Sequence, residues 1–194
     1  MYRGIWTWEK CGKKLHSLRG RLGFPDSPSL RFLKLNLSLE TGQIHDEIRN
    51  RPFPEIQPAV YCLLAGYAEA KITEETHKLV SFAQLPGGQN YNNAFHRRAV
   101  QPIEKTFGTD PERLLKAAEL FDGEKMALGD CSTKIYALPL VPIVVILHAA
   151  SSEFSASANM LFDSSISNYL STEQAAMLGE LTAARLRLAD EAIT

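Results

Sequence analysis

The segment RFLKLNLSLE, residues 31–40, alternates between apolar and polar side chains. One face of this segment carries four leucines, namely Leu33, Leu35, Leu37 and Leu39. A hydrophobic period of two predicts a single half-buried β-strand. The ETGQ that follows predicts a turn into a short partner strand near Ile44.

Apolar residues recur at helical spacing further along the chain. In residues 53–70, prolines suit a helix start and an apolar stripe follows them. A second helix is predicted from about Asn92, because four apolar residues follow one another at intervals of four: Phe95, Ala99, Ile103 and Phe107. Pro102 would kink this helix or end its regular part, and Gly108 would close it.

A last helix is predicted to begin near Ser171, where Ser171 and Gln174 fit a capping box. Its apolar stripe consists of Met177, Leu181, Ala184 and Leu188. Such a stripe is the side that an amphipathic helix usually turns toward the core.

Three segments are interpreted as buried strands. KLVSFAQL predicts a strand that ends at Pro86, and STKIYAL and PIVVILHA predict two more. SSEFSASAN is rich in small polar residues and is interpreted as an exposed loop that lines a pocket. Strands and helices mix without a regular β–α–β order. The sequence therefore predicts a single α+β domain over residues 1–194, with a largely antiparallel sheet packed against helices.

The composition is ordinary for a globular chain, with 45% hydrophobic and 22% charged residues and a net charge of −1. This balance gives no general attraction to nucleic acid or membranes. Residues 1–30 are interpreted as a basic helical segment, and residues 1–34 carry eight cations against two carboxylates, a net charge of +6. The segment would either bind phosphate backbones or form a solvated helix face. We favour the second interpretation and expect no nucleic-acid partner.

Three cysteines stand far apart, at Cys11, Cys62 and Cys131. Their odd number and wide spacing argue against a disulfide framework and against a metal site made by this chain alone. The most apolar segment, residues 135–150, is too short to span a membrane and is interrupted by two prolines. Because the N-terminus lacks a signal-peptide pattern, we expect a cytoplasmic protein without a membrane partner.

The segment PGGQNYNNAFHRR, residues 86–98, holds the strongest candidate for a binding site. Its two glycines allow a tight turn, and the helix behind them would present free N–H groups and a partial positive charge. The side chains of Arg97 and Arg98 lean back toward that end, and one of them would reach a phosphate or carboxylate there, with His96 beside it. The predicted ligand-binding residues are Gly87, Gly88, Tyr91, His96, Arg97 and Arg98. The alternative is a plain turn, which the lack of a G-x-G-x-x-G or Walker spacing favours.

Weaker candidates for catalysis are three acids in apolar surroundings and one histidine: Asp130, Glu153, Asp163 and His148. Carboxyl groups in such places can act as general acids or bases, but they also form turns and cap helices, as Asp163 before two serines could. His148 follows a buried strand and would either bind a metal or haem-type iron or be a hydrogen-bonded core residue. None of the five histidines forms a metal-binding motif, so no metal site is predicted.

Three blocks of the sequence carry a resemblance to a known family. They are FAQLPGGQNYNNAFHRRAVQPIEKTFG, GDCSTKIYALPLVPIVVILHAASSEF and SANMLFDSSISNYLSTEQAAMLGEL, and AVYCLLAGYAEA precedes them. Residues 59–188 resemble the DUF3786 family of bacterial and archaeal proteins in the order and spacing of these blocks and in several unusual residue strings.

The resemblance implies no particular activity, so whether the protein is an enzyme and which cofactor it uses stay open. Some members of the family look like fusions to cysteine-rich iron–sulfur modules, of the kind seen beside corrinoid proteins in anaerobes. This implies a ligand-binding or accessory protein in anaerobic redox or cofactor metabolism. Its partners would be an anionic small molecule and an iron–sulfur or corrinoid protein, and it could form oligomers. The alternatives are an enzyme that acts on a small anionic or tetrapyrrole-like substrate through acid–base carboxylates, and a protein–protein adaptor.

Overall fold

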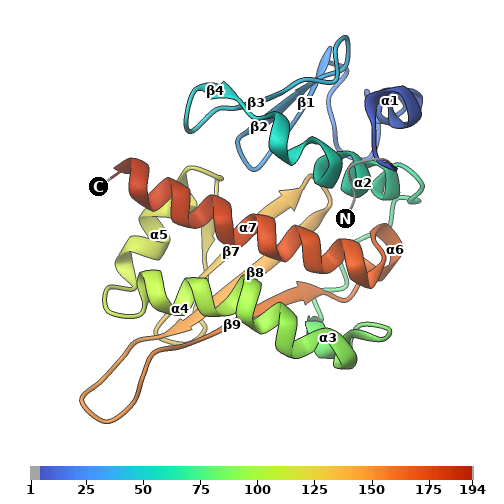
Figure 1. Ribbon diagram of the computed structural model, residues 1–194. Helices are drawn as coiled ribbons and strands as arrows, with labels where there is room; N and C mark the ends of the chain where they lie inside the picture. The colour runs from blue at the N-terminus through green and yellow to red at the C-terminus, as the bar shows by residue number, and fades with distance from the viewer. Residues whose placement is uncertain (1–4, 194) are drawn as a thin grey trace.

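The computed structural model describes residues 5–193, in which two antiparallel sheets and their helices share one hydrophobic core (Figure 1). This arrangement confirms the predicted α+β class. The chain builds two sheets where the sequence pattern indicated one. In the described part of the chain, no helix combines the length and the apolar character needed to cross a bilayer.

The first sheet contains β1 (Ser29–Phe32), β2 (Leu35–Ser38), β3 (Ile44–Asp46) and β4 (Arg51–Pro52), in that spatial order. It packs beside α1 (Trp8–His16) and α2 (Gln57–Tyr67), and a short 3₁₀ turn (Pro54–Ile56) leads into α2. The partner strand expected near Ile44 is confirmed as β3.

The prediction of one strand over residues 31–40 is wrong, because the chain turns back in the middle of the alternating pattern. Leu33 and Lys34 have left-handed φ angles of 46° and 56° and join β1 to β2 as a two-residue hairpin turn. Neither residue favours that conformation, so tertiary contacts must hold it. The contacts come from Arg185, whose Nε donates to the Leu33 carbonyl at 2.9 Å and whose Nη2 donates to the Lys34 carbonyl at 3.1 Å.

The second sheet has the order β5 (Leu79–Ser81), β9 (Ser157–Asp163), β8 (Val141–His148), β7 (Cys131–Leu138) and β6 (Glu124–Lys125). The two predicted strands of its centre are confirmed as β7 and β8. The strand expected to run to Pro86 is shorter, because a 3₁₀ turn (Phe82–Gln84) begins after Ser81. Ser81 and Gln84 form a capping box at the start of this turn. The expected loop SSEFSASAN is exposed over residues 151–155, but β9 begins at Ser157.

One long helical segment covers the second sheet and consists of α3 (Gly88–Phe95), a π-helical turn (His96–Val100) and α4 (Gln101–Phe107). It begins four residues before the predicted Asn92. Pro102 does not end the helix. Its nitrogen cannot donate a hydrogen bond to the preceding turn, and the chain accommodates this by widening into the π-helical turn just before it. The four predicted apolar positions, from Phe95 to Phe107, are all buried.

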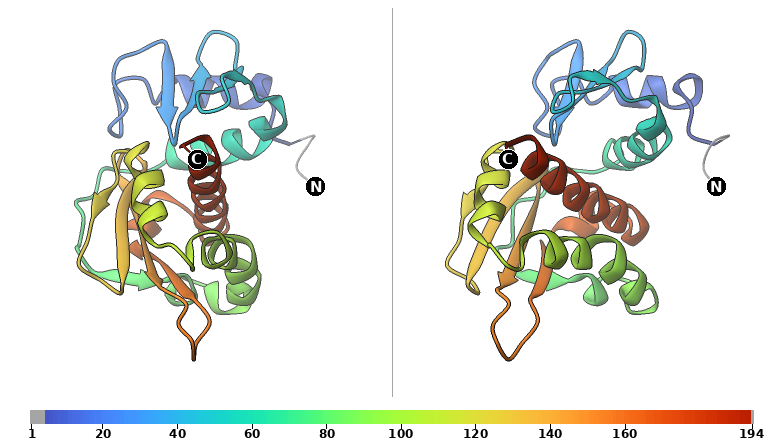
Figure 2. Two further views of the ribbon diagram at one scale, coloured as in Figure 1. Left: turned by 90° about the vertical axis from the view of Figure 1, so that its left-hand side faces the viewer. Right: turned by 60° about the vertical axis from the view of Figure 1, so that its left-hand side comes forward.

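The remaining helices are α5 (Glu112–Glu119), the short α6 (Ile166–Tyr169) and the long α7 (Thr172–Ile193). Helix α7 crosses the molecule, with the second sheet behind it and the first sheet and α2 above it (Figures 1 and 2). The predicted capping box is confirmed, since the Ser171 amide donates to Gln174 Oε1 at 3.1 Å and the Gln174 amide donates to Ser171 Oγ at 3.3 Å.

The predicted apolar stripe of α7 is not the most buried face of the helix. Met177, Leu181 and Leu188 are only half-buried, and Ala184 is exposed. The buried side chains lie on the adjacent faces of the helix: Ala175, Leu178, Gly179, Thr182, Ala183, Arg185, Leu186, Ala189 and Asp190. Elements pack against α7 from several sides, so its buried surface is wider than one stripe and includes polar residues that a hydrophobic pattern does not identify.

Candidate functional site

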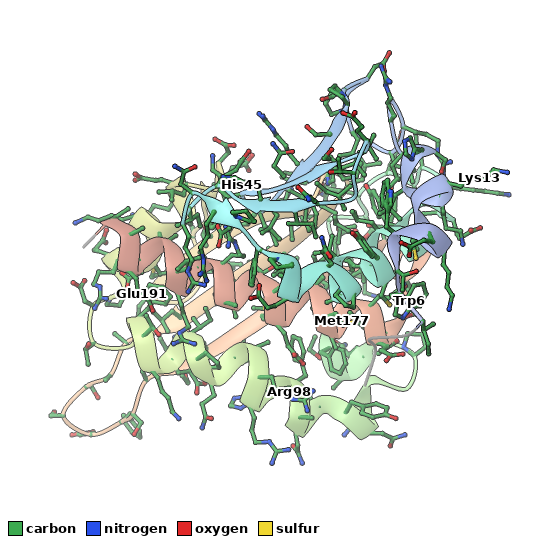
Figure 3. All side chains as sticks on the ribbon, turned by 45° about the horizontal axis from the view of Figure 1, so that its top comes forward. Trp6, Lys13, His45, Arg98, Met177 and Glu191 are labelled. Carbon is green, nitrogen blue, oxygen red and sulfur yellow. The ribbon has the colours of Figure 1, made fainter. Side chains whose placement is uncertain are left out.

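Helices α2, α3 and α7 border an open groove of about 760 Å³. We call it the α3–α7 groove. Its floor is the N-terminal half of α7. Figure 3 shows Met177 there, between α2 and the long helical segment that carries Arg98. The α7 residues are Thr172, Glu173, Ala176, Met177, Glu180 and Leu181. The other lining residues are Ala59, Phe82, Pro86, Gly87, Tyr91, Ala94, Phe95 and Arg98.

The close approach of α3 to α7 at the base of the groove depends on small and aromatic residues. The Phe82 and Phe95 rings stack with centroids 4.3 Å apart and form part of the lining. A Cβ at Gly179 would lie 2.6 Å from the Phe95 ring, so only glycine lets α7 pass this close. The groove is therefore fixed by the packing of two helices and is not formed by a mobile loop.

The two predicted glycines make the turn that starts α3. Gly87 has a φ of 74°, in the left-handed region, and a Cβ there would meet open space. A Cβ at Gly88 would lie 2.0 Å from the Phe82 carbonyl oxygen, so this position has no room for a side chain. Thr172 Oγ1 donates to the Pro86 carbonyl at 2.7 Å and ties the turn to the start of α7. These contacts give the glycines a structural role, whatever binds nearby.

The six predicted ligand-binding residues divide into two groups. Gly87, Tyr91 and Arg98 line the α3–α7 groove. The others are outside its lining: Gly88 is buried beneath the turn, Arg97 is exposed, and His96 lies with its Nε2 3.5 Å from Glu104 Oε1.

Three charged residues line the groove, Arg98, Glu173 and Glu180, and Arg98 forms an ion pair with Glu180. Arg98 Nη1 lies 3.6 Å from Glu180 Oε1 on α7. The two side chains are 69% and 35% exposed, so water screens this pair. Because the geometry is loose and the guanidinium is accessible, Arg98 can exchange Glu180 for another anion at little cost.

Of the four weaker candidates, Asp130, His148 and Glu153 lie near one end of the second sheet, and Asp163 lies at the other end of β9. Asp130 Oδ2 accepts a hydrogen bond from the Ala149 amide at 2.9 Å, and Glu153 is exposed in the loop between β8 and β9. His148 ends β8 and pairs with Ser157, whereas Asp163 is at the opposite end of β9. None of these residues lines the α3–α7 groove.

Asp163 has a clear structural role. Its Oδ1 accepts hydrogen bonds from the Thr76 amide, the Thr76 hydroxyl and the Ser165 amide, at 2.9–3.0 Å. Burial raises the pKa of this carboxyl, but the hydrogen bonds from Ser165 and Thr76 outweigh it and lower the pKa to about 2. Asp163 is therefore ionised at neutral pH and joins the segment before β5 to the end of β9.

Three cations of the basic N-terminal segment pair with acids of the same chain. Lys14 Nζ lies 2.5 Å from Glu69, Arg19 pairs with Asp26, and Arg31 Nε lies 3.4 Å from Glu47. Arg3, which contributes to the predicted excess charge, lies outside the described residues. This pairing agrees with the interpretation of the segment as a solvated face.

Sequence reasoning missed the contribution of α7 to the groove, including Met177, Glu180 and Leu181. The sequence did carry a signal for this contribution, because Met177 and Leu181 belong to the predicted apolar stripe of the last helix. A hydrophobic stripe indicates contact with something apolar but does not say whether this is the core or an open groove. Within residues 5–193, no three His, Cys, Asp or Glu side chains gather as metal ligands would.

Two antiparallel sheets that share one core beside a long C-terminal helix define the class of the molecule as an α+β protein. The family model described as "Domain of unknown function (DUF3786)" matches residues 24–185, so the chain belongs to this family. The match includes the first sheet, which lies ahead of the blocks that carry the resemblance in the sequence. No curated protein and no solved structure matches the chain.

Proposed function

We propose that the protein binds a small molecule with an apolar body and an anionic group in the α3–α7 groove, and serves as a ligand-binding or accessory protein. The observation that carries this proposal is the groove itself, whose floor and walls are mostly apolar and whose rim holds Arg98. Its volume of about 760 Å³ is within the range typical of small-molecule sites.

The lining suits a ligand of mixed character. Met177 and Leu181 offer apolar surface that water covers when the groove is empty, and burial of apolar ligand surface there is favourable. Arg98 can form a charge-assisted, bidentate contact with a carboxylate or phosphate, which fixes the orientation of the ligand. Glu180 would then give up its contact with Arg98, and an exposed ion pair of this kind contributes little stability.

Binding is proposed in preference to catalysis because of where the acids lie. An enzyme that uses Asp130, Glu153, Asp163 or His148 needs these groups within hydrogen-bond reach of one bound substrate. The α3–α7 groove does not include them among its lining residues. The biological setting that we propose, anaerobic redox or cofactor metabolism linked to iron–sulfur or corrinoid proteins, is supported by the family resemblance alone.

Native mass spectrometry on protein purified without oxygen tests for a resident ligand. We expect an extra mass that denaturation releases, and this mass would name the ligand class. Affinity for decanoate and for decylamine, measured by titration calorimetry, tests the chemistry of the groove directly. Decanoate should bind more tightly, because its carboxylate can pair with Arg98.

Arg97 offers a matched control for Arg98, since the two arginines are adjacent and only Arg98 lines the groove. Arg98→Ala should weaken decanoate binding about tenfold, the loss of one charge-assisted contact, while Arg97→Ala should change it little. Equal affinity for decanoate in the wild type and Arg98→Ala would refute the proposed anion contact. No binding of either probe to the wild type would refute the groove as an amphipathic site.

A further inference from the structure

The loop between β8 and β9 projects from the body of the molecule and ends in an exposed aromatic side chain. Figure 2 shows this loop clear of both sheets. Phe154 is 73% exposed and follows Glu153, which is also exposed. An accessible phenylalanine on a projecting loop has no role in the core and is typical of an anchor that enters a partner's pocket.

The tip of this loop is preorganised. Ser151 Oγ accepts hydrogen bonds from the amides of Glu153 and Phe154, at 3.2 and 3.1 Å, and the Ser151 amide donates to the Phe154 carbonyl at 2.9 Å. The base is also held, since the Ala150 amide donates to the Gly108 carbonyl at 2.9 Å. A preorganised loop loses little conformational entropy when it binds, which favours a role in recognition.

The α3–α7 groove offers an apolar surface and a cation that match the two side chains of this tip, beside the acids Glu173 and Glu180 of its lining. The α3–α7 groove offers an apolar floor for an aromatic ring, with Met177 and Leu181 in its lining. Arg98 at the groove is 69% exposed and can pair with a carboxylate beside that ring. Phe154 and the adjacent Glu153 present the required pair of groups.

The loop of one molecule does not reach its own groove. Its base lies against Gly108, just after α4, whereas the nearest groove residue on the same helical segment is Arg98. At 1.5 Å per residue, the ten positions between them span about 15 Å. The loop also points away from α3 in Figures 1 and 2.

We propose that the β8–β9 loop of a second copy of this chain docks in the α3–α7 groove, with Phe154 on the apolar floor and Glu153 paired with Arg98. Such a contact buries less surface than a standard protein–protein interface, so the association is weak and depends on concentration. It is also sensitive to salt, because its ion pair lies at the surface. The contact competes with a small molecule for the groove and thereby couples ligand binding to self-association.

Sedimentation velocity at protein concentrations up to about 1 mM tests this contact through a charge exchange. Glu153→Arg and Arg98→Glu each place like charges at the contact, so each variant alone should remain monomeric. A mixture of the two should associate again, because each loop then faces a groove of opposite charge. Phe154→Ala should lower the association constant about tenfold or more.

Ile72→Ala is the matched control for Phe154→Ala, since it removes an equally exposed apolar side chain elsewhere. It should associate like the wild type. A wild type that stays monomeric at about 1 mM would overturn the proposal. So would association that survives Phe154→Ala, or a mixture of the charge variants that fails to associate. None of these results depends on whether decanoate binds to dilute monomer, so the two proposals can fail separately.

Discussion

Among the arginine–carboxylate pairs that involve α7, Arg185–Asp46 and Arg98–Glu180 differ in almost every physical respect. Arg185 Nη2 lies 2.8 Å from Asp46 Oδ1, and the two side chains are 3% and 1% exposed. Arg98 Nη1 lies 3.6 Å from Glu180 Oε1, and both groups reach water. The first pair joins two distant parts of the fold, and the second borders the α3–α7 groove.

The buried pair is supported on both sides. Arg185 also donates to the carbonyls of the Leu33–Lys34 turn, and Asp46 Oδ1 accepts hydrogen bonds from the amides of Ile48 and Arg49. Burial raises the pKa of Asp46, but the hydrogen bond and charge of Arg185 outweigh it, so the net pKa is lowered. Asp46 Oδ2 is buried and makes no hydrogen bond within residues 5–193.

The comparison shows that surroundings, and not residue type, decide what an ion pair does. A buried pair with extra hydrogen bonds cannot exchange partners without leaving a charge uncompensated in the interior. An exposed pair with one long contact can exchange partners readily. We therefore assign Arg185–Asp46 to the stability of the fold and Arg98–Glu180 to recognition.

The largest effect is expected from breaking the buried pair. Arg185→Met should lower the free energy of unfolding by about 3–5 kcal/mol, because it leaves Asp46 charged and unpaired and removes the donors to two carbonyls. Urea denaturation measures the change. Arg187→Met, on the exposed side of the same helix, should cost less than about 0.5 kcal/mol. Equal losses in the two variants would contradict the role of Arg185.

A smaller effect, with a defined pH dependence, is expected at Asp163. Its pKa is about 2 in the folded protein against an ordinary value of 3.8, so its ionised form contributes about 2 kcal/mol of stability at neutral pH. This contribution is fully present above about pH 5 and is lost as the pH falls toward 2. Asp163→Asn should therefore be less stable than the wild type at pH 7, and the gap should close in acid. Parallel pH profiles for both proteins would exclude this account.

The two glycines that start α3 should respond differently to alanine. Gly88→Ala forces a Cβ against the Phe82 carbonyl oxygen and should cost about 1–3 kcal/mol, since rigid backbone must move. Gly87→Ala meets open space and carries only the left-handed conformational penalty, about 1 kcal/mol. Thermal unfolding of both variants measures the difference. A larger loss at Gly87 would show that the turn packs differently.

The smallest effect on stability is expected from the exposed pair. Arg98→Ala should change the free energy of unfolding by less than about 0.5 kcal/mol, while it weakens decanoate binding. Denaturation and titration of the same preparation measure both quantities. A loss of stability as large as that of Arg185→Met would remove the distinction between the two pairs.

Much of the fold could be predicted because local patterns carry it. The i, i+4 series through Phe95, the strands β7 and β8, and the Ser171–Gln174 capping box each depend on residues near in sequence. The hairpin turn at Leu33 could not be predicted, because Arg185, about 150 positions away, holds it through its donors. Tertiary contacts of this kind override local preference.

The candidate site was predictable in part for the same reason. The Gly-Gly turn and the helix behind it are local features, and three of the six predicted residues, Gly87, Tyr91 and Arg98, line the groove. The floor on α7 comes from residues about 80 positions later in the chain. His96 and Arg97 fall outside because Tyr91, Ala94, Phe95 and Arg98 follow the i, i+3, i+4, i+7 spacing of one helix face, and the two positions before Arg98 lie off that face.

The central claim, that the α3–α7 groove binds an amphipathic anion, is tested most directly by filling the groove. Ala94 lines it from α3 and is only half-buried, so Ala94→Trp should occupy the space without disturbing the core. Titration calorimetry should show decanoate binding to the wild type and none to Ala94→Trp, while urea denaturation shows similar stability for both. Unchanged decanoate affinity in the folded variant would place the ligand elsewhere and contradict the account.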